Sequence, residues 1–345
     1  DGIDVRAALF AREDRPVNPV GQLGPGRHDH GRPRPDQRLV GGEAGDIGDP
    51  DRVDEENLRS DFESPDFKIE ENVWTATDAN GNIVARVENA WGTGARNWSN
   101  VWVDPSLKRR DLEAHLVEMT EKAMRAQVAV QFPDGRAVSA ERYVTPIEND
   151  TRDLYVEMGY RYIRSFYHMG VDLITLGEIP APELPAGLEI RPVEAAHLPQ
   201  IYEAVIESFA DHWGWSGRPY EDWLYYAVNS PGSDTKLWRI AWAGDQVASV
   251  TINRPFGEAI PDKGWISTVG TRRPWRRLGL GTILLRESFR ALRDAGFKQA
   301  SLGVDAASLT GAVALYERAG MYVEVRYDGY AKMLRGDWLP IYPQE

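Results

Sequence analysis

Hydrophobic and polar positions follow strand and helix periods in two long stretches of the chain. In the first stretch, residues 73–77 and 83–88 alternate as strands do, and the sequence Asp-Ala-Asn-Gly between them predicts a hairpin turn. The same stretch predicts helices over 53–62 and 107–126, a strand over 100–103, a short helix that ends at 155–159 and strands within 160–173.

The second stretch alternates between strands and helices more regularly. The expected strands cover 188–191, 237–243, 246–253, 265–271, 300–304 and 322–333, and the expected helices cover 195–209, 282–295 and 310–319. The segment before it, residues 177–187, contains three prolines and two glycines, which exclude a continuous helix or a central strand. We therefore predict a linker at 177–187 between two mixed α/β (α+β) domains, each with a central sheet flanked by helices.

The two stretches also repeat each other. The sequence V-W-V-D-P-S-L-K-R-R-D-L-E-A-H-L in the first corresponds to V-G-T-R-R-P-W-R-R-L-G-L-G-T-I-L-L in the second, and L-Y-V-E-M-G-Y corresponds to L-Y-E-R-A-G-M. Each pair occurs in the same order within its stretch, which predicts two tandem copies of one fold, over 46–176 and 188–345.

Residues 1–45 do not fit this pattern. Residues 21–45 mix Gly, Pro, Arg, His and Asp with almost no apolar period, a composition that buries too little surface to offset the entropy of ordering. We expect poor order here. Because a first helix is missing from this copy, a shifted reading frame over the segment is a sharper hypothesis.

The most informative motif lies between an expected strand and an expected helix, in Arg276-Arg277-Leu278-Gly279-Leu280-Gly281-Thr282. Glycine allows a close approach of the backbone, and the first amides of a helix are unpaired and attract anions. The motif therefore predicts a phosphate or pyrophosphate site. A tight turn with close helix–sheet packing is the structural alternative. A P-loop is excluded because Thr282 stands where it needs lysine. A dinucleotide fingerprint is disfavoured because Leu284 stands where it needs a small residue, although Asp305 closes the next strand as a ribose-binding acid does.

Tyr316 is the second candidate, in A-L-Y-E-R-A-G-M on the last expected helix. A lone helical tyrosine is most often a core residue. Its position after the glycine motif changes that interpretation, because the two sequences together resemble the core of the GNAT superfamily of N-acyltransferases over about 188–334. In this family the pyrophosphate loop has the form R/Q-x-x-G-x-G/A, and Arg276, Gly279 and Gly281 match its three defined positions.

The resemblance implies roles for particular residues. Tyr316 would protonate the leaving thiolate of CoA. Ser308 stands where many relatives have asparagine, which makes the CoA contact there less certain. The residues implied to bind acetyl-CoA are Val269, Thr271, Arg276, Arg277, Leu278, Gly279, Leu280, Gly281, Thr282 and Ser308.

The first copy lacks the glycine loop, because Asp111 and Glu113 replace the two glycines. Two carboxylates would repel a pyrophosphate and their side chains would block its approach. Tyr155 keeps the tyrosine position but is expected to be structural. We therefore predict a degenerate N-terminal copy, and the doubled architecture resembles the mycothiol synthases, a tandem GNAT family that acetylates the amine of a cysteinyl pseudodisaccharide.

No motif singles out the acceptor site or the general base. The sequence F-A-D-H-W-G-W follows the first helix of the second copy, where GNAT acceptor sites are commonly walled, so Asp211, Trp213 and Trp215 are candidate substrate contacts. A packed helix end is the structural alternative. The candidate bases that would take the ammonium proton are His212, Glu258 and Asp262; the two acids also fit a solvated loop.

Composition narrows the function further. The net charge of −13 argues against sequence-independent binding of nucleic acid or of an anionic membrane. The absence of cysteine excludes a cysteine nucleophile, which suits direct attack by the amine, and the histidines form no common zinc motif, so no metal is expected. No apolar run reaches the length of a membrane helix and the first residues do not resemble a signal peptide, so we expect a cytoplasmic monomer or homodimer.

The sequence therefore predicts an enzyme that transfers an acetyl group from acetyl-CoA to a primary amine of a small molecule. Two alternatives use the same fold. One is a CoA-binding sensor without activity, and the other is an aminoacyl transferase that uses charged tRNA. The acidic composition and the intact glycine loop argue against the tRNA alternative.

Overall fold

In the computed structural model, the residues whose structure is described are 4–7, 67–91, 94–104, 106–107, 110–230, 232–257, 260–308 and 310–341. In the N-terminal half the strands are β1 (Asp4–Ala7), β2 (Val73–Thr77), β3 (Ile83–Trp91), β4 (Arg96–Val103), β5 (Val138–Val144) and β6 (Arg161–Asp172). The helices of this half are α4 (Ile69–Asn72), α5 (Arg110–Gln131) and α6 (Asn149–Glu157). The helix expected at 53–62 and most of the segment 1–45 lie outside the described residues.

The C-terminal half alternates strands and helices in the predicted order. Its strands are β7 (Leu188–Arg191), β8 (Arg239–Ala243), β9 (Gln246–Pro255), β10 (Lys263–Thr271), β11 (Gln299–Asp305) and β12 (Tyr322–Arg335). Its α-helices are α7 (Leu198–Phe209), α8 (Tyr220–Leu224), α9 (Leu280–Asp294) and α10 (Ala312–Arg318). The mixed α/β architecture predicted from the sequence is confirmed.

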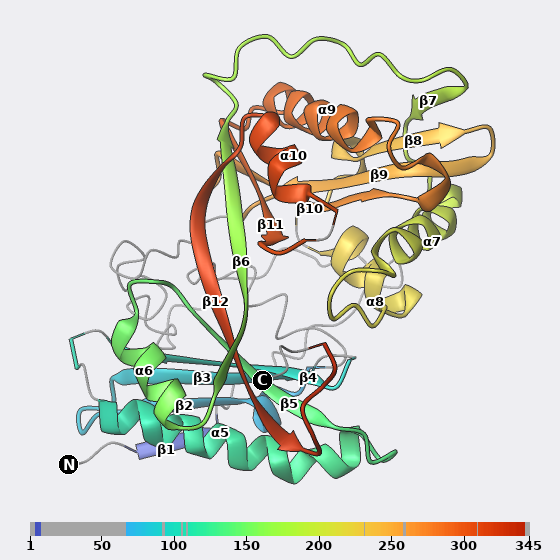
Figure 1. Ribbon diagram of the computed structural model, residues 1–345. Coiled ribbons are helices and arrows are strands. Elements are labelled where there is room, and N and C mark those ends of the chain that lie inside the picture. Colours follow the sequence, from blue (N-terminus) through green and yellow to red (C-terminus); the bar gives the residue numbers. More distant parts are fainter. Residues whose placement is uncertain are drawn as a thin grey trace, which may run out of the picture.

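A single 12-stranded sheet runs through both halves in the order β1-β2-β3-β4-β5-β12-β6-β11-β10-β9-β8-β7. Its centre shows an exchange of strands. Strand β6 of the N-terminal half pairs antiparallel with β11, and β12 of the C-terminal half pairs antiparallel with β5. The two exchanged strands also pair with each other, and they form the long central ribbon that joins the lobes in Figure 1.

This exchange bears on the predicted division of the chain. Residues 177–187 contain no helix or strand, as expected for a linker, and they run from the end of β6 to β7. Yet β6, which precedes the linker, pairs within the sheet of the C-terminal half, and β12, which follows it, pairs within the sheet of the N-terminal half. The assignment of 46–176 and 188–345 to separate domains stays a prediction.

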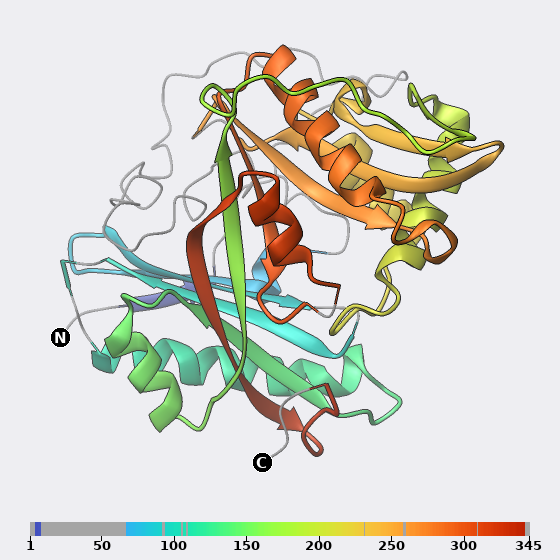
Figure 2. The same cartoon turned by 45° about the horizontal axis from the view of Figure 1, so that its top comes forward.

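Helices cover the two halves differently. In the C-terminal half, Thr251 of β9 hydrogen-bonds Ser288 of α9, whereas its neighbours Val250 and Ile252 pack in the cluster that contains α7. Because alternate residues of a strand point to opposite faces, α7 and α9 cover opposite faces of this sheet. In the N-terminal half, α5 packs on one face, and Figure 2 shows α5 and α6 along the same side of β3, β4 and β5.

Turn chemistry explains the predicted hairpin. Oδ1 of Asp78 accepts hydrogen bonds from the amides of Asn80 and Asn82, both at 2.9 Å, and Gly81 has a φ of +83°. Aspartate bonds its own turn and glycine adopts the left-handed region without strain, so this sequence folds back locally. The pattern missed β5, because its charged residues Glu141 and Arg142 are fully buried.

Candidate active site

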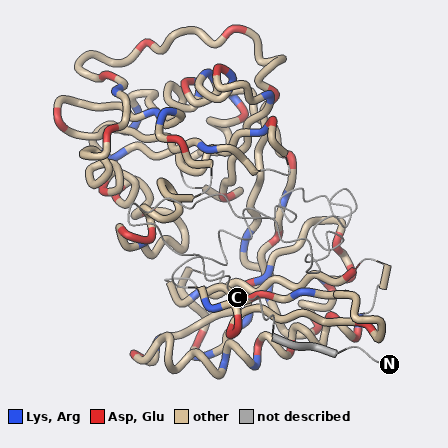
Figure 3. Tube along the Cα trace, turned by 180° about the vertical axis from the view of Figure 1, so that it is seen from behind, with Lys and Arg blue, Asp and Glu red and all other residues tan. Residues whose placement is uncertain are grey.

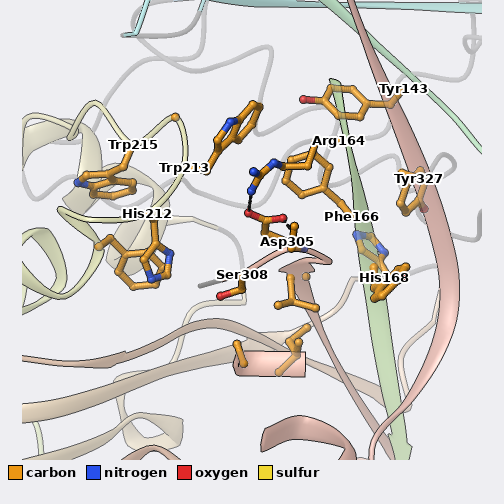
Figure 4. A pocket seen from close by; sticks show the side chains of 18 of the residues that line it. Tyr143, Arg164, Phe166, His168, His212, Trp213, Trp215, Asp305, Ser308 and Tyr327 are labelled. Atoms are coloured by element: carbon orange, nitrogen blue, oxygen red, sulfur yellow. Dashed lines mark hydrogen bonds and ion pairs between the residues drawn. The ribbon is translucent and has the colours of Figure 1, made fainter. Parts of the chain in front are cut away.

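A cavity of about 940 Å³ lies where the two halves of the molecule meet. Strands β3, β4 and β5 of the N-terminal half, the exchanged strands β6 and β12, and β10, β11 and α10 all contribute side chains to it. Aromatic residues dominate the wall, and Figure 4 shows several of them around the Arg164–Asp305 pair. The aromatic and histidine side chains that line it are Trp102, Tyr143, Phe166, Tyr167, His168, Phe209, His212, Trp213, Trp215, Tyr316 and Tyr327.

The cavity reaches into a wedge between β10 and β11. These parallel strands pair only at Lys263–Trp265 with Gln299–Ser301, and no register pair follows although both strands continue. The backbone of β10 is irregular between Ile266 and Thr268. Val269 of β10 and Leu302 of β11 face the cavity within this wedge. An extended chain can therefore enter between the strands and use backbone groups that the sheet leaves free.

The glycine motif forms the loop between β10 and α9. Gly279 has a φ of +79° and Arg277 a φ of +66°, so two left-handed residues turn the chain into the helix. Among the described residues, no acceptor takes a hydrogen bond from the amides of residues 277–282. Free amides at a helix N-terminus suit an anionic phosphate group.

The residues of the loop differ in their exposure. Arg277, Leu278 and Gly279 are exposed, while Leu280 is buried and anchors the helix. Gly281 packs close to α10, because a Cβ atom on it would lie 3.4 Å from Leu315 Cδ1. The loop therefore sits against the helix that carries Tyr316.

Arg276, a predicted CoA contact, makes its bonds within the protein. Its Nη1 donates to Asp211 Oδ2 at 2.6 Å, its Nη2 donates to the Ser208 carbonyl at 3.1 Å and its Nε donates to the Thr271 carbonyl at 3.1 Å. The hydrogen bond to Asp211 raises the pKa of Arg276 and lowers that of the carboxyl. Arg276 thus ties the end of α7 to the end of β10 and fixes the start of the loop.

Tyr316 lines the cavity from α10 and is 7% exposed. Burial raises the pKa of Tyr316 to about 12. No described residue forms a hydrogen bond with its hydroxyl group. The phenol therefore stays protonated near neutral pH and its proton is free for transfer to a group in the cavity.

The sequence 209–215 lies on the wall of the cavity, as Figure 4 shows for His212, Trp213 and Trp215. The N-terminal half holds this segment in place. Arg96 donates from Nη1 to the Gly214 carbonyl at 3.2 Å, and its guanidinium lies 4.2 Å from the ring centre of Trp213. Arg96 is itself fixed by a bidentate bond to the buried Glu141, at 2.6 and 2.8 Å.

The three candidate bases lie in different places. Glu258 is outside the described residues. Asp262 is exposed, pairs with Lys298 at 2.6 Å and does not line the cavity. His212 lines the cavity, and burial lowers its pKa below 6.5, an effect that Asp211 partly opposes. Of the candidates that the structure describes, His212 is the one placed to accept a proton from a ligand.

The remaining predicted residues occupy the edges of the wedge. Thr271 shares a hydrogen bond of 2.8 Å with Ser249 Oγ, and Ser308 shares one of 2.9 Å with Thr310 Oγ1 while lining the cavity. Asp305, the candidate ribose ligand, accepts a hydrogen bond from Arg164. A ribose hydroxyl would therefore compete with an existing ion pair.

Several residues that line the cavity were not predicted from the sequence. Arg164, Phe166 and His168 come from β6, and Tyr327 comes from β12. His168 sits beside Trp265 and Tyr327, with ring centres 5.2 and 4.9 Å away. No local motif marks these positions, because they reach the cavity only through the exchange of strands.

Acidic and basic residues are interspersed along both halves of the described chain, as Figure 3 shows. In the same described ranges, no helix is both long and apolar enough to cross a membrane, and no three metal-ligating side chains of histidine, aspartate or glutamate come together.

The site thus brings together a splayed pair of parallel strands, a loop of free amides and a buried tyrosine. Comparison with known proteins identifies the family. Residues 198–321 match the model of the Acetyltransferase (GNAT) family. This part of the chain is a GNAT acetyltransferase domain, and the resemblance seen in the sequence is confirmed.

Individual relatives extend the comparison. A mycothiol acetyltransferase of Thermobispora bispora is 29% identical over 175 residues, which span 47% of this chain and about half (55%) of that protein. A GCN5-related N-acetyltransferase of Sphaerobacter thermophilus is 26% identical with a TM-score of 0.76, covering 99% of this chain and 98% of that one. A tandem GNAT protein from the clavulanic acid biosynthesis pathway shares the fold, with a TM-score of 0.59 and 15% identity over 88% and 97% of the two chains.

Proposed function

We propose that this chain transfers an acetyl group from acetyl-CoA to a primary amine of a small molecule by direct attack. The observation that carries the proposal is that the wedge between β10 and β11 opens into the same cavity that Tyr316 and His212 line. The pyrophosphate of CoA would bind the free amides of residues 277–282, and its pantetheine arm would run along Val269 in the wedge.

The reaction needs two proton transfers and no covalent enzyme intermediate. The amine nitrogen attacks the thioester carbonyl carbon, and His212 takes a proton from it. The C–S bond then breaks, and Tyr316 gives its proton to the departing thiolate, so the products are an amide and free CoA thiol. The lowered pKa of His212 and the raised pKa of Tyr316 leave each group in the protonation state that its step requires.

The cavity extends from the wedge to the N-terminal half, so it leaves room for an acceptor larger than a simple alkylamine beside the pantetheine arm. About 940 Å³ is near the upper end of small-molecule sites. The relative from Thermobispora bispora is named a mycothiol acetyltransferase. Amines carried on larger polar molecules are therefore the first class of acceptor to test. Binding of acetyl-CoA, a cytoplasmic location and a monomeric or homodimeric state belong to the same proposal.

Release of free CoA thiol tests the proposal. The chain is incubated with acetyl-CoA and a panel of primary amines, and thiol is measured against a reaction without amine. We expect amine-dependent release and a product heavier than the amine by one acetyl group. Tight binding of acetyl-CoA without release for any amine would instead indicate a sensor.

A further inference from the structure

One wall of the cavity belongs entirely to the degenerate N-terminal half. We call it the N-terminal wall; its residues are Arg86 and Glu88 of β3, Asn100 and Trp102 of β4, and Tyr143 of β5. On β3, Arg86 and Glu88 alternate with Ala85 and Val87, which pack against α5 on the opposite face of the sheet. The half that lacks the glycine loop thus still presents a sheet face to the acceptor side of the site.

Glu88 is incompletely paired within this wall. Its Oε1 accepts a hydrogen bond from Asn100 Nδ2 at 3.2 Å. Its Oε2 is buried and lies 3.7 Å from Arg86 Nη2, beyond hydrogen-bond distance, and no described group donates to it. A buried carboxylate oxygen without a donor is costly, so a ligand that supplies one recovers that free energy.

The neighbours of Glu88 hold it in this state. The Arg86 guanidinium stacks 4.0 Å from the ring centre of Trp102, which keeps it from closing on the carboxylate. Burial raises the pKa of Glu88, while Arg86 and Asn100 oppose that rise. Tyr143, two strands away on β5, donates its hydroxyl hydrogen to Glu141, at 2.7 Å.

We propose that Glu88 binds a hydrogen-bond donor, a hydroxyl or an ammonium group, at the end of the acceptor remote from the reacting amine. The acceptor would then span the cavity, with its amine near Tyr316 and His212 and its polar end on the N-terminal wall. This inference rests on the proposed function for the identity of the ligand. It assigns the degenerate half the task of selecting the acceptor, in place of binding CoA.

Binding measurements test this without turnover. Calorimetry compares 1,8-diaminooctane and 8-amino-1-octanol with 1-aminooctane, which lacks the second donor, and includes the shorter and longer homologues of each. We expect at least one length of the diamine or the amino alcohol to bind about tenfold more tightly than its monoamine, about 1.4 kcal/mol. The two series distinguish an ammonium from a hydroxyl as the preferred group.

Glu88→Gln is the decisive variant. The amide keeps the shape of the side chain, and because Asn100 donates to its oxygen, an NH₂ group takes the place of Oε2. Glu189→Gln is the matched control, since Glu189 also pairs with an arginine two residues away in its strand but is exposed at the sheet edge. The preference for the second donor should vanish in Glu88→Gln and persist in Glu189→Gln, with acetyl-CoA affinity unchanged in both.

The outcomes separate the two proposals. Equal binding of all probes to the wild-type chain, or a preference that survives in Glu88→Gln, overturns the role of Glu88. Failure of every amine to release CoA thiol overturns the proposed function but leaves the binding result standing.

Discussion

The two halves contain the same wedge between parallel strands, and they fill it differently. In the C-terminal half, β10 and β11 part after Trp265 and Ser301, and the next residue of β11 is Leu302, which faces the cavity. In the N-terminal half, β4 and β5 part after Trp98 and Glu141 in the same way, but the next residue of β5 is Arg142.

Arg142 closes the N-terminal wedge from inside. It is fully buried and donates to the Ser99 carbonyl at 3.3 Å, to Thr120 Oγ1 at 2.6 Å and to the Tyr160 hydroxyl at 2.9 Å. The bond to Ser99 joins β5 to β4 where the other half leaves its strands apart. One arginine therefore occupies a backbone carbonyl inside the N-terminal wedge, where the C-terminal wedge stays open to the cavity.

The largest expected effect is the loss of acetyl-CoA binding in Gly279→Asp. The substitution places a carboxylate beside the proposed pyrophosphate, which costs more than about 4 kcal/mol of binding free energy. The new residue also stands at a φ of +79°, which strains the folded chain with or without the ligand. The dissociation constant for acetyl-CoA, measured by calorimetry, should rise more than about 1000-fold.

Gly244→Asp is the control for this variant. Gly244 has a φ of +58° in the turn between β8 and β9, so it carries the backbone strain without the charge near the loop. Wild-type affinity for acetyl-CoA in Gly279→Asp would show that the C-terminal loop is not the phosphate site.

Tyr316→Phe should reduce kcat by about 10²–10⁴-fold with little change in the KM for acetyl-CoA, because it removes only the proton donor. Tyr155→Phe alters the counterpart in the N-terminal half, whose ring packs 5.7 Å from that of Tyr160, and should leave kcat unchanged. Equal rates for Tyr316→Phe and the wild type across the pH range would reduce Tyr316 to a packing residue.

His212→Asn should reduce kcat by about 100-fold at neutral pH. Because burial lowers the pKa of His212, its neutral form accepts a proton only above that value, so wild-type activity should rise with pH through a midpoint below 6.5. That limb should disappear in the variant. His168→Asn is the matched variant at the histidine of β6 that also lines the cavity. A larger loss of kcat in this variant than in His212→Asn would indicate that His168 is the base.

Arg96→Lys should produce the smallest change, a rise of about fivefold in the KM for the acceptor. Lysine cannot keep both the bidentate bond to Glu141 and the bond to the Gly214 carbonyl, so the 211–215 segment loses one of its anchors, while Arg276 still holds Asp211. The KM for acetyl-CoA should stay constant, and thermal denaturation checks that the variant is folded. An unchanged acceptor KM would contradict this link between the halves.

The sequence predicts the elements of this site that depend on local chain geometry. The glycine loop lies within one turn and Tyr316 lies on one helix, so both stand in short contiguous motifs, and the resemblance of those motifs to the GNAT superfamily made them candidates. Arg164 and Glu88 could not be found in this way, because they line one cavity only when the strands of both halves join in a single sheet. Asp211 shows a further limit of prediction from sequence. Its segment was a candidate wall of the acceptor site, but its ion pair with Arg276 was not predicted.

The stoichiometry of acetyl-CoA binding tests the comparison of the two wedges most directly. Calorimetric titration of the wild-type chain should show one site per chain, and the same titration of Gly279→Asp should show none in the measurable range. Two equivalent sites in the wild type, or one site of unchanged affinity in Gly279→Asp, would show that the N-terminal wedge binds the cosubstrate despite Arg142.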